Sequence, residues 1–188
     1  MKTIDGRKTS PLGHREPQVL PREPGGYVLV FRLDENVRIR PGKLGITELL
    51  PGHYLYFGSA LSGLAPRLAR HLRRRKKRHW HIDSLTSAIR PHEVWWIATK
   101  SRMECDWARL ARADEEASIP VPGFGSSDCR CSSHLMRLES EAALTRVLMH
   151  IAAVTPGTNR LDVPARLTSR FLNSARVGAM RAPSDQAI

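Results

Sequence analysis

The chain has 188 residues, 41% of them hydrophobic, which is enough for one folded domain with a sizeable core and argues against a disordered protein. Lysine and arginine number 30 against 18 aspartates and glutamates, and the resulting net charge of +12 favours a phosphate-bearing partner, either nucleic acid or an anionic membrane. A membrane is disfavoured, because no apolar run approaches the roughly 20 residues that span a bilayer and the polar N-terminus lacks the apolar core of a signal peptide.

The first part of the chain is expected to contain a mobile arm followed by strands, with Val37–Arg40 able to return as a second strand after Tyr27–Leu33. Residues 1–24 are rich in proline, glycine and charge and show no periodicity, which indicates an arm. The β-branched and aromatic run Tyr27–Leu33 is typical of a buried strand, and His53–Phe57 is the next strand. Because side chains alternate along a strand, Tyr54 and Tyr56 are predicted to share one face.

A helix is predicted from about Leu64 to Arg75, after a turn at residues 58–60. Leucines recur every fourth residue from the start of this segment, which marks the stripe that packs against the core. Arg67 and His71 lie four residues apart on a neighbouring face, so both side chains can point into one site.

The rest of the chain is predicted to alternate between helices and strands. We expect helices at Trp80–Ser87, Arg102–Arg112 and Glu141–Val154, and strands at Glu93–Thr99 and His134–Glu139. The intervening loop, residues 119–133, contains prolines and glycines, and a loop of this length in a compact domain is more often functional than accidental. The chain is therefore divided into an arm (1–24), a folded domain (25–140), and a C-terminal helix with a weakly ordered tail (141–188).

A dense basic run occupies the end of the first helix and the residues that follow it. A few cations at a helix C-terminus are stabilised by the helix dipole, but a continuous block of like charges repels itself, which favours phosphate contact over a solvated helix end. We therefore predict salt-sensitive nucleic-acid binding. The residues predicted to bind are Arg70, Arg73, Arg74, Arg75, Lys76, Lys77, Arg78 and His79.

Phenol, guanidinium and imidazole groups beside a cationic surface suit the hydrolysis of a phosphodiester. The reaction needs an activated water and stabilisation of the charge that grows on phosphorus. A phenol is a poor base at its ordinary pKa of about 10, and a nearby cation lowers that pKa. The planar donor fork of Arg67 matches phosphate oxygens, and the carboxylate of Glu104 is a hard ligand suited to Mg²⁺.

Several motifs occur in an order that resembles a known family. They are Gly25-Gly26-Tyr27, Tyr56-Phe57-Gly58, Arg67 with His71, and Glu104, accompanied by the strings YLYFGSA (54–60) and PGFGSSDCRCSSHL (122–135). Together they resemble the GIY-YIG nuclease superfamily, most closely an uncharacterised prokaryotic and archaeal branch sometimes fused to an endonuclease III-type glycosylase. The resemblance covers about residues 25–138. It implies a small mixed α/β (α+β) domain with a central three-stranded, mostly antiparallel sheet flanked by helices.

The same resemblance implies an endonuclease that uses Mg²⁺ or Mn²⁺ to cut DNA, with repair as a setting. Tyr27 would position or deprotonate the attacking water, and Tyr56 would hydrogen-bond into the same site. Arg67 would stabilise the transition state, His71 would be an auxiliary base or phosphate contact, and Glu104 would be the protein ligand of one divalent metal.

Simpler readings of these residues stay open. Tyrosine is enriched in strands, so both phenols can be ordinary strand residues, and a glutamate in a first helical turn also stabilises the helix dipole. The segment Val37–Leu50 separates the two tyrosines and looks like an insertion relative to the superfamily. The alternatives to a nuclease are a non-catalytic nucleic-acid-binding module with a degenerate site and a zinc-stabilised domain that binds RNA.

Three cysteines, an odd number, argue against a disulfide framework and favour a reducing compartment, so we expect a cytoplasmic protein. Cys129, Cys131 and His134 place three soft ligands within six residues, and Cys105 could complete a tetrahedral Zn²⁺ site. The alternatives are buried core cysteines or, less favoured, a nucleophilic pair of Cys129 with His134. Asp128 is expected to support this region as a neighbouring carboxylate.

Overall fold

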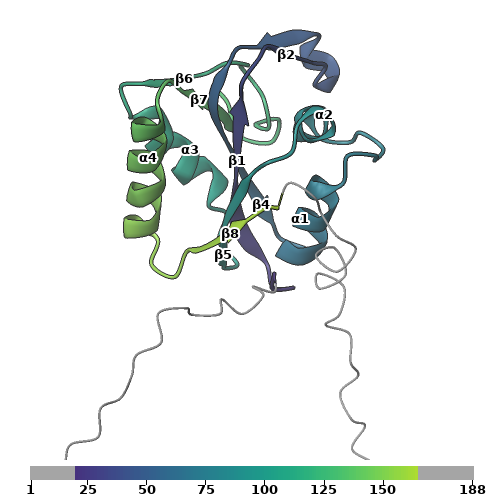
Figure 1. Cartoon of the computed structure of the whole chain (residues 1–188). Coiled ribbons are helices and arrows are strands. Elements are labelled where there is room, and N and C mark those ends of the chain that lie inside the picture. Colours follow the sequence, from purple (N-terminus) through teal and green to yellow (C-terminus); the bar gives the residue numbers. More distant parts are fainter. Residues whose placement is uncertain (1–19, 165–188) are drawn as a thin grey trace, which may run out of the picture.

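A six-stranded antiparallel sheet forms the centre of the computed structural model, which describes residues 20–164 (Figure 1). Its strands run in the order β6-β7-β4-β1-β5-β8. The elements in chain order are β1 (Gly25–Leu33), β2 (Val37–Ile39), η1 (Gly42–Leu44), β3 (Thr47–Leu49), β4 (Gly52–Ala60), α1 (Leu64–Leu72), α2 (His81–Ala88), β5 (Glu93–Ala98), α3 (Glu104–Arg112), β6 (Ala117–Ser118), β7 (Leu135–Leu138), α4 (Glu141–Val154) and β8 (Asn159–Asp162).

Each face of the sheet has its own hydrophobic core because side chains alternate along β1. Tyr27, Leu29 and Phe31 point into the core shared with α1 and α2. Val28 and Val30 point into the core shared with α3 and α4. Figure 1 shows the same arrangement, with α3 and α4 on one side of the sheet and α1 and α2 on the other. The buried Tyr54 and Tyr56 lie in the first core, which confirms that they share one face.

The predicted mixed α/β class is confirmed, but the expected sheet of three strands is wrong. The central strands are β4, β1 and β5, β7 (Leu135–Leu138) matches the strand expected at His134–Glu139, and β6 and β8 widen the sheet at its two edges. The two residues of β6 and the four of β8 are too few to show a period-two pattern. Residues 159–162, expected in a weakly ordered tail, instead pair with β5. The rest of that tail, residues 165–188, and residues 1–19 of the expected arm lie outside the described residues.

Two local boundaries also differ from expectation. β4 continues through Gly58 to Ala60, where a turn was predicted, because Gly58 pairs with Tyr27 of β1. The helix expected to reach Arg75 ends at Leu72. Lys76 folds back over this end, and its ammonium group donates to the carbonyl oxygens of Arg70 (3.2 Å) and His71 (2.9 Å). The basic run therefore leaves the helix and forms the connection to α2.

The expected insertion Val37–Leu50 folds into a hairpin. β2 and β3 pair antiparallel, with Ile39 and Leu49 turned into the core and β2 lying against α2. Among residues 20–164, none of the helices combines the length and the apolar character needed to cross a membrane.

Candidate active site and metal centre

One cavity of about 140 Å³ brings together all five side chains proposed for catalysis. Two of them come from neighbouring strands of the sheet, two come from one helix, and one comes from the start of another helix. They are Tyr27 on β1, Tyr56 on β4, Arg67 and His71 on α1, and Glu104 at the start of α3. The cavity therefore lies where the sheet, α1 and the first turn of α3 meet.

Glycines make room for the two phenols. Tyr27 pairs across the sheet with Gly58, and a β-carbon at Gly58 would overlap the ring and hydroxyl of Tyr27. Gly125 has a φ of +76°, and a β-carbon there would lie 2.9 Å from Cε2 of Tyr56. Larger residues at these two positions would push the rings out of the cavity.

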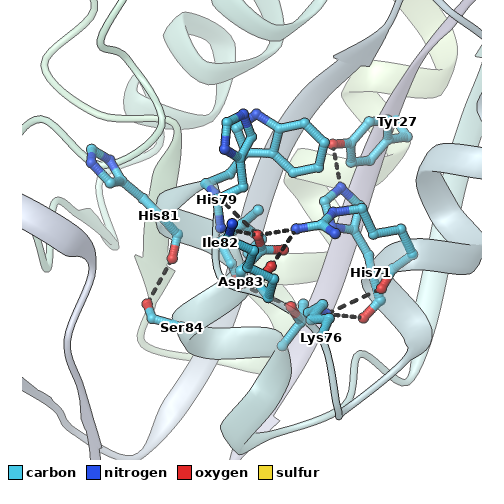
Figure 2. Close-up of polar contacts among 12 residues, drawn as sticks. Tyr27, His71, Lys76, His79, His81, Ile82, Asp83 and Ser84 are labelled. Carbon is cyan, nitrogen blue, oxygen red and sulfur yellow. Dashed lines mark hydrogen bonds and ion pairs between the residues drawn. The ribbon is translucent and has the colours of Figure 1, made fainter.

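Tyr27 and His71 form a buried hydrogen-bonded pair. The hydroxyl oxygen of Tyr27 lies 2.8 Å from Nε2 of His71, as Figure 2 shows. Burial lowers the pKa of His71 to about 3, assisted by the charge of Lys76. Burial also raises the pKa of Tyr27, and the proximity of Tyr56 adds to this, while Arg67 opposes it. Both members of the pair are therefore uncharged at neutral pH.

The phenolate forms of Tyr27 and Tyr56 are disfavoured in this structure. Burial raises the pKa of Tyr56 as well, against the lowering influence of the Arg67 guanidinium. The two rings are 6.4 Å apart between centroids, close enough that ionising one phenol disfavours ionising the other. Arg67 alone does not offset the effect of burial on the pKa of either phenol. Both phenols therefore remain protonated and act as hydrogen-bonding groups.

Glu104 is only 8% exposed and faces two partners that sequence patterns did not predict. The hydroxyl of Ser59 donates to Oε2, and the guanidinium of Arg102 lies 3.9 Å from Oε1. Arg102 also lies 3.2 Å from the exposed carboxylate of Asp128, which lines the same cavity. Two carboxylates thus converge at the mouth of the cavity. Sequence patterns assign neither Ser59 nor Arg102 to the site, because Ser59 lies within the string YLYFGSA (54–60) without a role of its own and a lone arginine matches no motif.

The predicted nucleic-acid-binding residues divide into two groups. Arg70 and Lys76 face inward: Arg70 lies 2.6 Å from the buried Asp83, and burial lowers the pKa of Lys76 to about 8. Their neighbours are exposed to solvent: Arg73, Arg74, Arg75, Lys77, Arg78 and His79. The first two residues have structural contacts that a phosphate would have to displace, so the exposed six make the cationic surface.

Asp83 shapes the turn that carries the basic run back to α2. Its carboxylate accepts hydrogen bonds from the backbone N–H groups of His79 (2.8 Å) and Trp80 (3.0 Å) as well as from Arg70 (Figure 2). Trp80 lines the same cavity as Tyr27 and Tyr56, and the guanidinium carbon of Arg67 lies 4.1 Å from the ring centroid of Trp80. The indole therefore holds Arg67 in place rather than offering a free face in this structure.

A second cluster collects all three cysteines and one histidine. The ligand atoms of Cys105, Cys129, Cys131 and His134 lie within 4.8 Å of one another, and the group could hold a metal ion. Nε2 of His134 is 3.4 Å from Sγ of Cys129 and 3.7 Å from Sγ of Cys105. A nitrogen at about 2.0 Å and a sulfur at about 2.3 Å from one tetrahedral Zn²⁺ lie roughly 3.5 Å apart. The spacing therefore fits tetrahedral coordination.

The cysteine cluster and the cavity lined by Tyr27, Tyr56 and Glu104 are contiguous. Glu104 directly precedes Cys105, and Asp128 directly precedes Cys129, so each carboxylate shares a backbone segment with a thiol. His134 belongs to the cluster and also lines the cavity. Burial lowers the pKa of His134, which keeps its imidazole in the neutral form that binds metals.

The depressed pKa of His71 predicts a measurable dependence of stability on pH. Below pH 6.5 the unfolded chain protonates this histidine, whereas the folded chain does not until pH falls to about 3. Stability should therefore fall as pH is lowered through this range, by up to about 1.4 kcal/mol per pH unit from this residue. Urea unfolding of wild type and His71→Gln between pH 4 and pH 7 should show a shallower dependence in the variant. Equal slopes would contradict the burial of a neutral imidazole.

A family model described as "Domain of unknown function DUF123" matches residues 26–155, which include the cavity of Tyr27 and Glu104 and the cysteine cluster. No curated protein and no solved structure matches the chain.

Proposed function

We propose, for a chain that belongs to the DUF123 family, that the protein is a cytoplasmic endonuclease that uses a divalent metal ion to hydrolyse phosphodiester bonds of DNA. The observation that carries the proposal is that two phenols, a guanidinium, an imidazole and a carboxylate line one small cavity. The ordered motifs that resemble the GIY-YIG nucleases support the same assignment of these residues. We place the activity in DNA repair on that resemblance alone.

In this proposal Arg67 binds the scissile phosphate. Its guanidinium lines the cavity and is held against Trp80 (4.1 Å to the ring centroid), so its donor fork is oriented before the substrate arrives. Preorganised donors that face the growing charge on a phosphoryl group are worth far more in a site sheltered from water than in solvent. Arg67 is therefore assigned to transition-state stabilisation.

Tyr27, Tyr56 and His71 orient the attacking water. All three are buried, and both phenols and the imidazole are uncharged at neutral pH because of that burial. Nδ1 of His71 is buried and has no hydrogen-bond partner among the described residues. An unpartnered acceptor is tolerated better than an unpartnered N–H, which favours donation from Nε2–H of His71 to the oxygen of Tyr27. The hydroxyl proton of Tyr27 is then directed into the cavity.

Glu104 would hold the divalent ion, Mg²⁺ or Mn²⁺. The surroundings of Glu104 fit such an ion. Its carboxylate is nearly buried and has one hydroxyl donor, Ser59, and one arginine, Arg102, at 3.9 Å. These partners leave negative charge that a cation would neutralise. The carboxylate oxygens are the hard ligands that Mg²⁺ prefers. Bound there, the ion would supply Lewis-acid stabilisation of the charge that grows on the phosphate.

A structural zinc ion is proposed for the cluster of Cys105, Cys129, Cys131 and His134. Three thiols and one imidazole are the ligand types of a closed structural zinc site, and their spacing fits a tetrahedron. Such an ion would tie the loop of residues 119–134 to α3. It would thereby fix Glu104 and Asp128 relative to each other at the mouth of the cavity.

The test of the proposed activity is cleavage by the purified full-length protein. Supercoiled plasmid and branched DNA should be nicked in Mg²⁺ or Mn²⁺ and left intact in EDTA, with products resolved on gels over time. Salt-sensitive binding without cleavage in any divalent metal would instead establish a nucleic-acid-binding module with a degenerate site. Preferential binding of RNA without cleavage would favour the zinc-stabilised RNA-binding alternative.

A further inference from the structure

A groove of about 400 Å³ lies next to the cavity that is proposed to be catalytic. All of the charged residues that line this groove are cations. Its charged walls are Arg40, Lys43 and Arg78, and no carboxylate lines it among the residues that the structure describes. The rest of the wall consists of Gly42, His79, Trp80, His81 and Ser84. A concave surface with three cations and no compensating acid concentrates positive potential and attracts anions.

The groove exists because of the hairpin formed by residues 37–50. Arg40 and Lys43 flank the bend between β2 and β3, which Gly42 turns with a φ of +57°. The opposite wall, with Arg78 and His79, comes from the connection between α1 and α2. β2 packs against α2, which sets the spacing between the two walls. A shorter connection between β1 and β4 would leave the second wall alone on the surface.

Two residues connect the groove with the catalytic cavity. Trp80 lines both, so the two spaces share one side chain as a wall. His81 lines the groove, and its Nδ1 accepts a hydrogen bond (3.1 Å) from the backbone N–H of Gly125, which lines the cavity. A polyanion whose reacting phosphate enters the cavity would therefore pass directly over the groove.

We propose that this groove binds the phosphate backbone of a single nucleic-acid strand on one side of the cleaved bond. This inference rests on the proposed function and gives the hairpin of residues 37–50 the role of a substrate clamp. A strand fits better than a free anion, because the three cations come from two separate segments and form two walls rather than converging on one point. The volume of about 400 Å³ accommodates the backbone of one strand and not the full width of a duplex.

The test is the salt dependence of binding to a fluorescent single-stranded oligonucleotide in EDTA, where no cleavage occurs. Each phosphate contact to a single strand contributes about 0.7 to the slope of log K against log salt. The triple variant Arg40→Gln/Lys43→Gln/Arg78→Gln should therefore reduce the magnitude of the slope by about 2. The control is Arg32→Gln. Arg32 is exposed, and because side chains alternate along β1 it lies on the same face of the sheet as Val28 and Val30, which is the face covered by α3 and α4. The slope of this control should stay as in wild type.

A second measurement locates the strand. Shortening the oligonucleotide on one side of the cleaved bond should weaken wild-type binding and have little further effect on the triple variant, whereas shortening the other side should weaken both equally. An unchanged slope in the triple variant, or equal sensitivity of both proteins to truncation on either side, would overturn the groove assignment. If the slope changes while wild type never cleaves, the groove stands as a binding site and the proposed hydrolysis fails.

Discussion

Glu104→Gln should abolish metal-stimulated cleavage, lowering the rate by about a thousandfold or more. The change keeps the size of the side chain and an oxygen that can accept from Ser59, but it removes the charge that would hold a divalent ion. Loss of one electrostatic contact in the transition state typically costs 10²–10³ in rate, about 3–4 kcal/mol, and the metal contribution is at least as large. Initial rates of plasmid nicking in Mg²⁺ and Mn²⁺ measure the effect.

Asp106→Asn is the matched control for this change. Asp106 lies in the same first turn of α3, but its side chain is 63% exposed and pairs only with Arg109 on the surface. An exposed pair of this kind contributes little to stability, so the control should cleave at nearly the wild-type rate. If Glu104→Gln cleaves as fast as Asp106→Asn, Glu104 does not hold the catalytic metal and the proposed site is wrong.

Cys131→Ser should release the zinc ion and strongly destabilise the protein. Structural zinc sites contribute about 10–16 kcal/mol of apparent binding free energy in small domains, so loss of one thiolate should lower the melting temperature by many degrees. Cys131 belongs to the cluster but does not line the catalytic cavity, so the loss of zinc can be separated from direct damage to the catalytic residues. The purified wild type should contain one zinc per chain by elemental analysis, and the variant close to none.

Ser127→Ala is the control for this experiment, since Ser127 is exposed in the same loop and no ligand of the cluster is changed. It should retain zinc and the wild-type melting temperature. A wild-type protein expressed in zinc-supplemented medium that holds no metal would remove the zinc assignment. The four residues would then be a polar cluster that packs the loop against α3.

Sequence patterns predicted which side chains gather in one cavity better than they predicted the edges of the sheet. The order of the tyrosine, arginine and glutamate motifs along the chain singled out all five candidate residues, and the structure brings their side chains into one cavity. The helix Glu141–Val154 agrees to the residue, because Ser140 caps it with a hydrogen bond to the N–H of Ala143. The strand β8 could not be predicted, because its pairing with β5 depends on a partner some 65 residues earlier in the chain.

The basic run illustrates a second limit of sequence reasoning. Counting charges treats Arg70 and Lys76 like their neighbours, yet one pairs with Asp83 and the other caps the end of α1. These roles depend on where the chain turns after Leu72. In the same way, a lone serine such as Ser59 becomes a partner of Glu104 only because β4 continues past the glycine that was expected to end it.

The pairing of β8 has a practical consequence for anyone who trims the chain. The family match ends at residue 155, four residues before β8 begins. A fragment cut at that point would leave the outer side of β5 without its hydrogen-bonding neighbour and would uncover Val94, whose cross-strand partner is Leu161. Open strands of this kind template self-association, and the buried Val163 donates its N–H to the carbonyl oxygen of His92, so a well-behaved fragment extends at least through Val163.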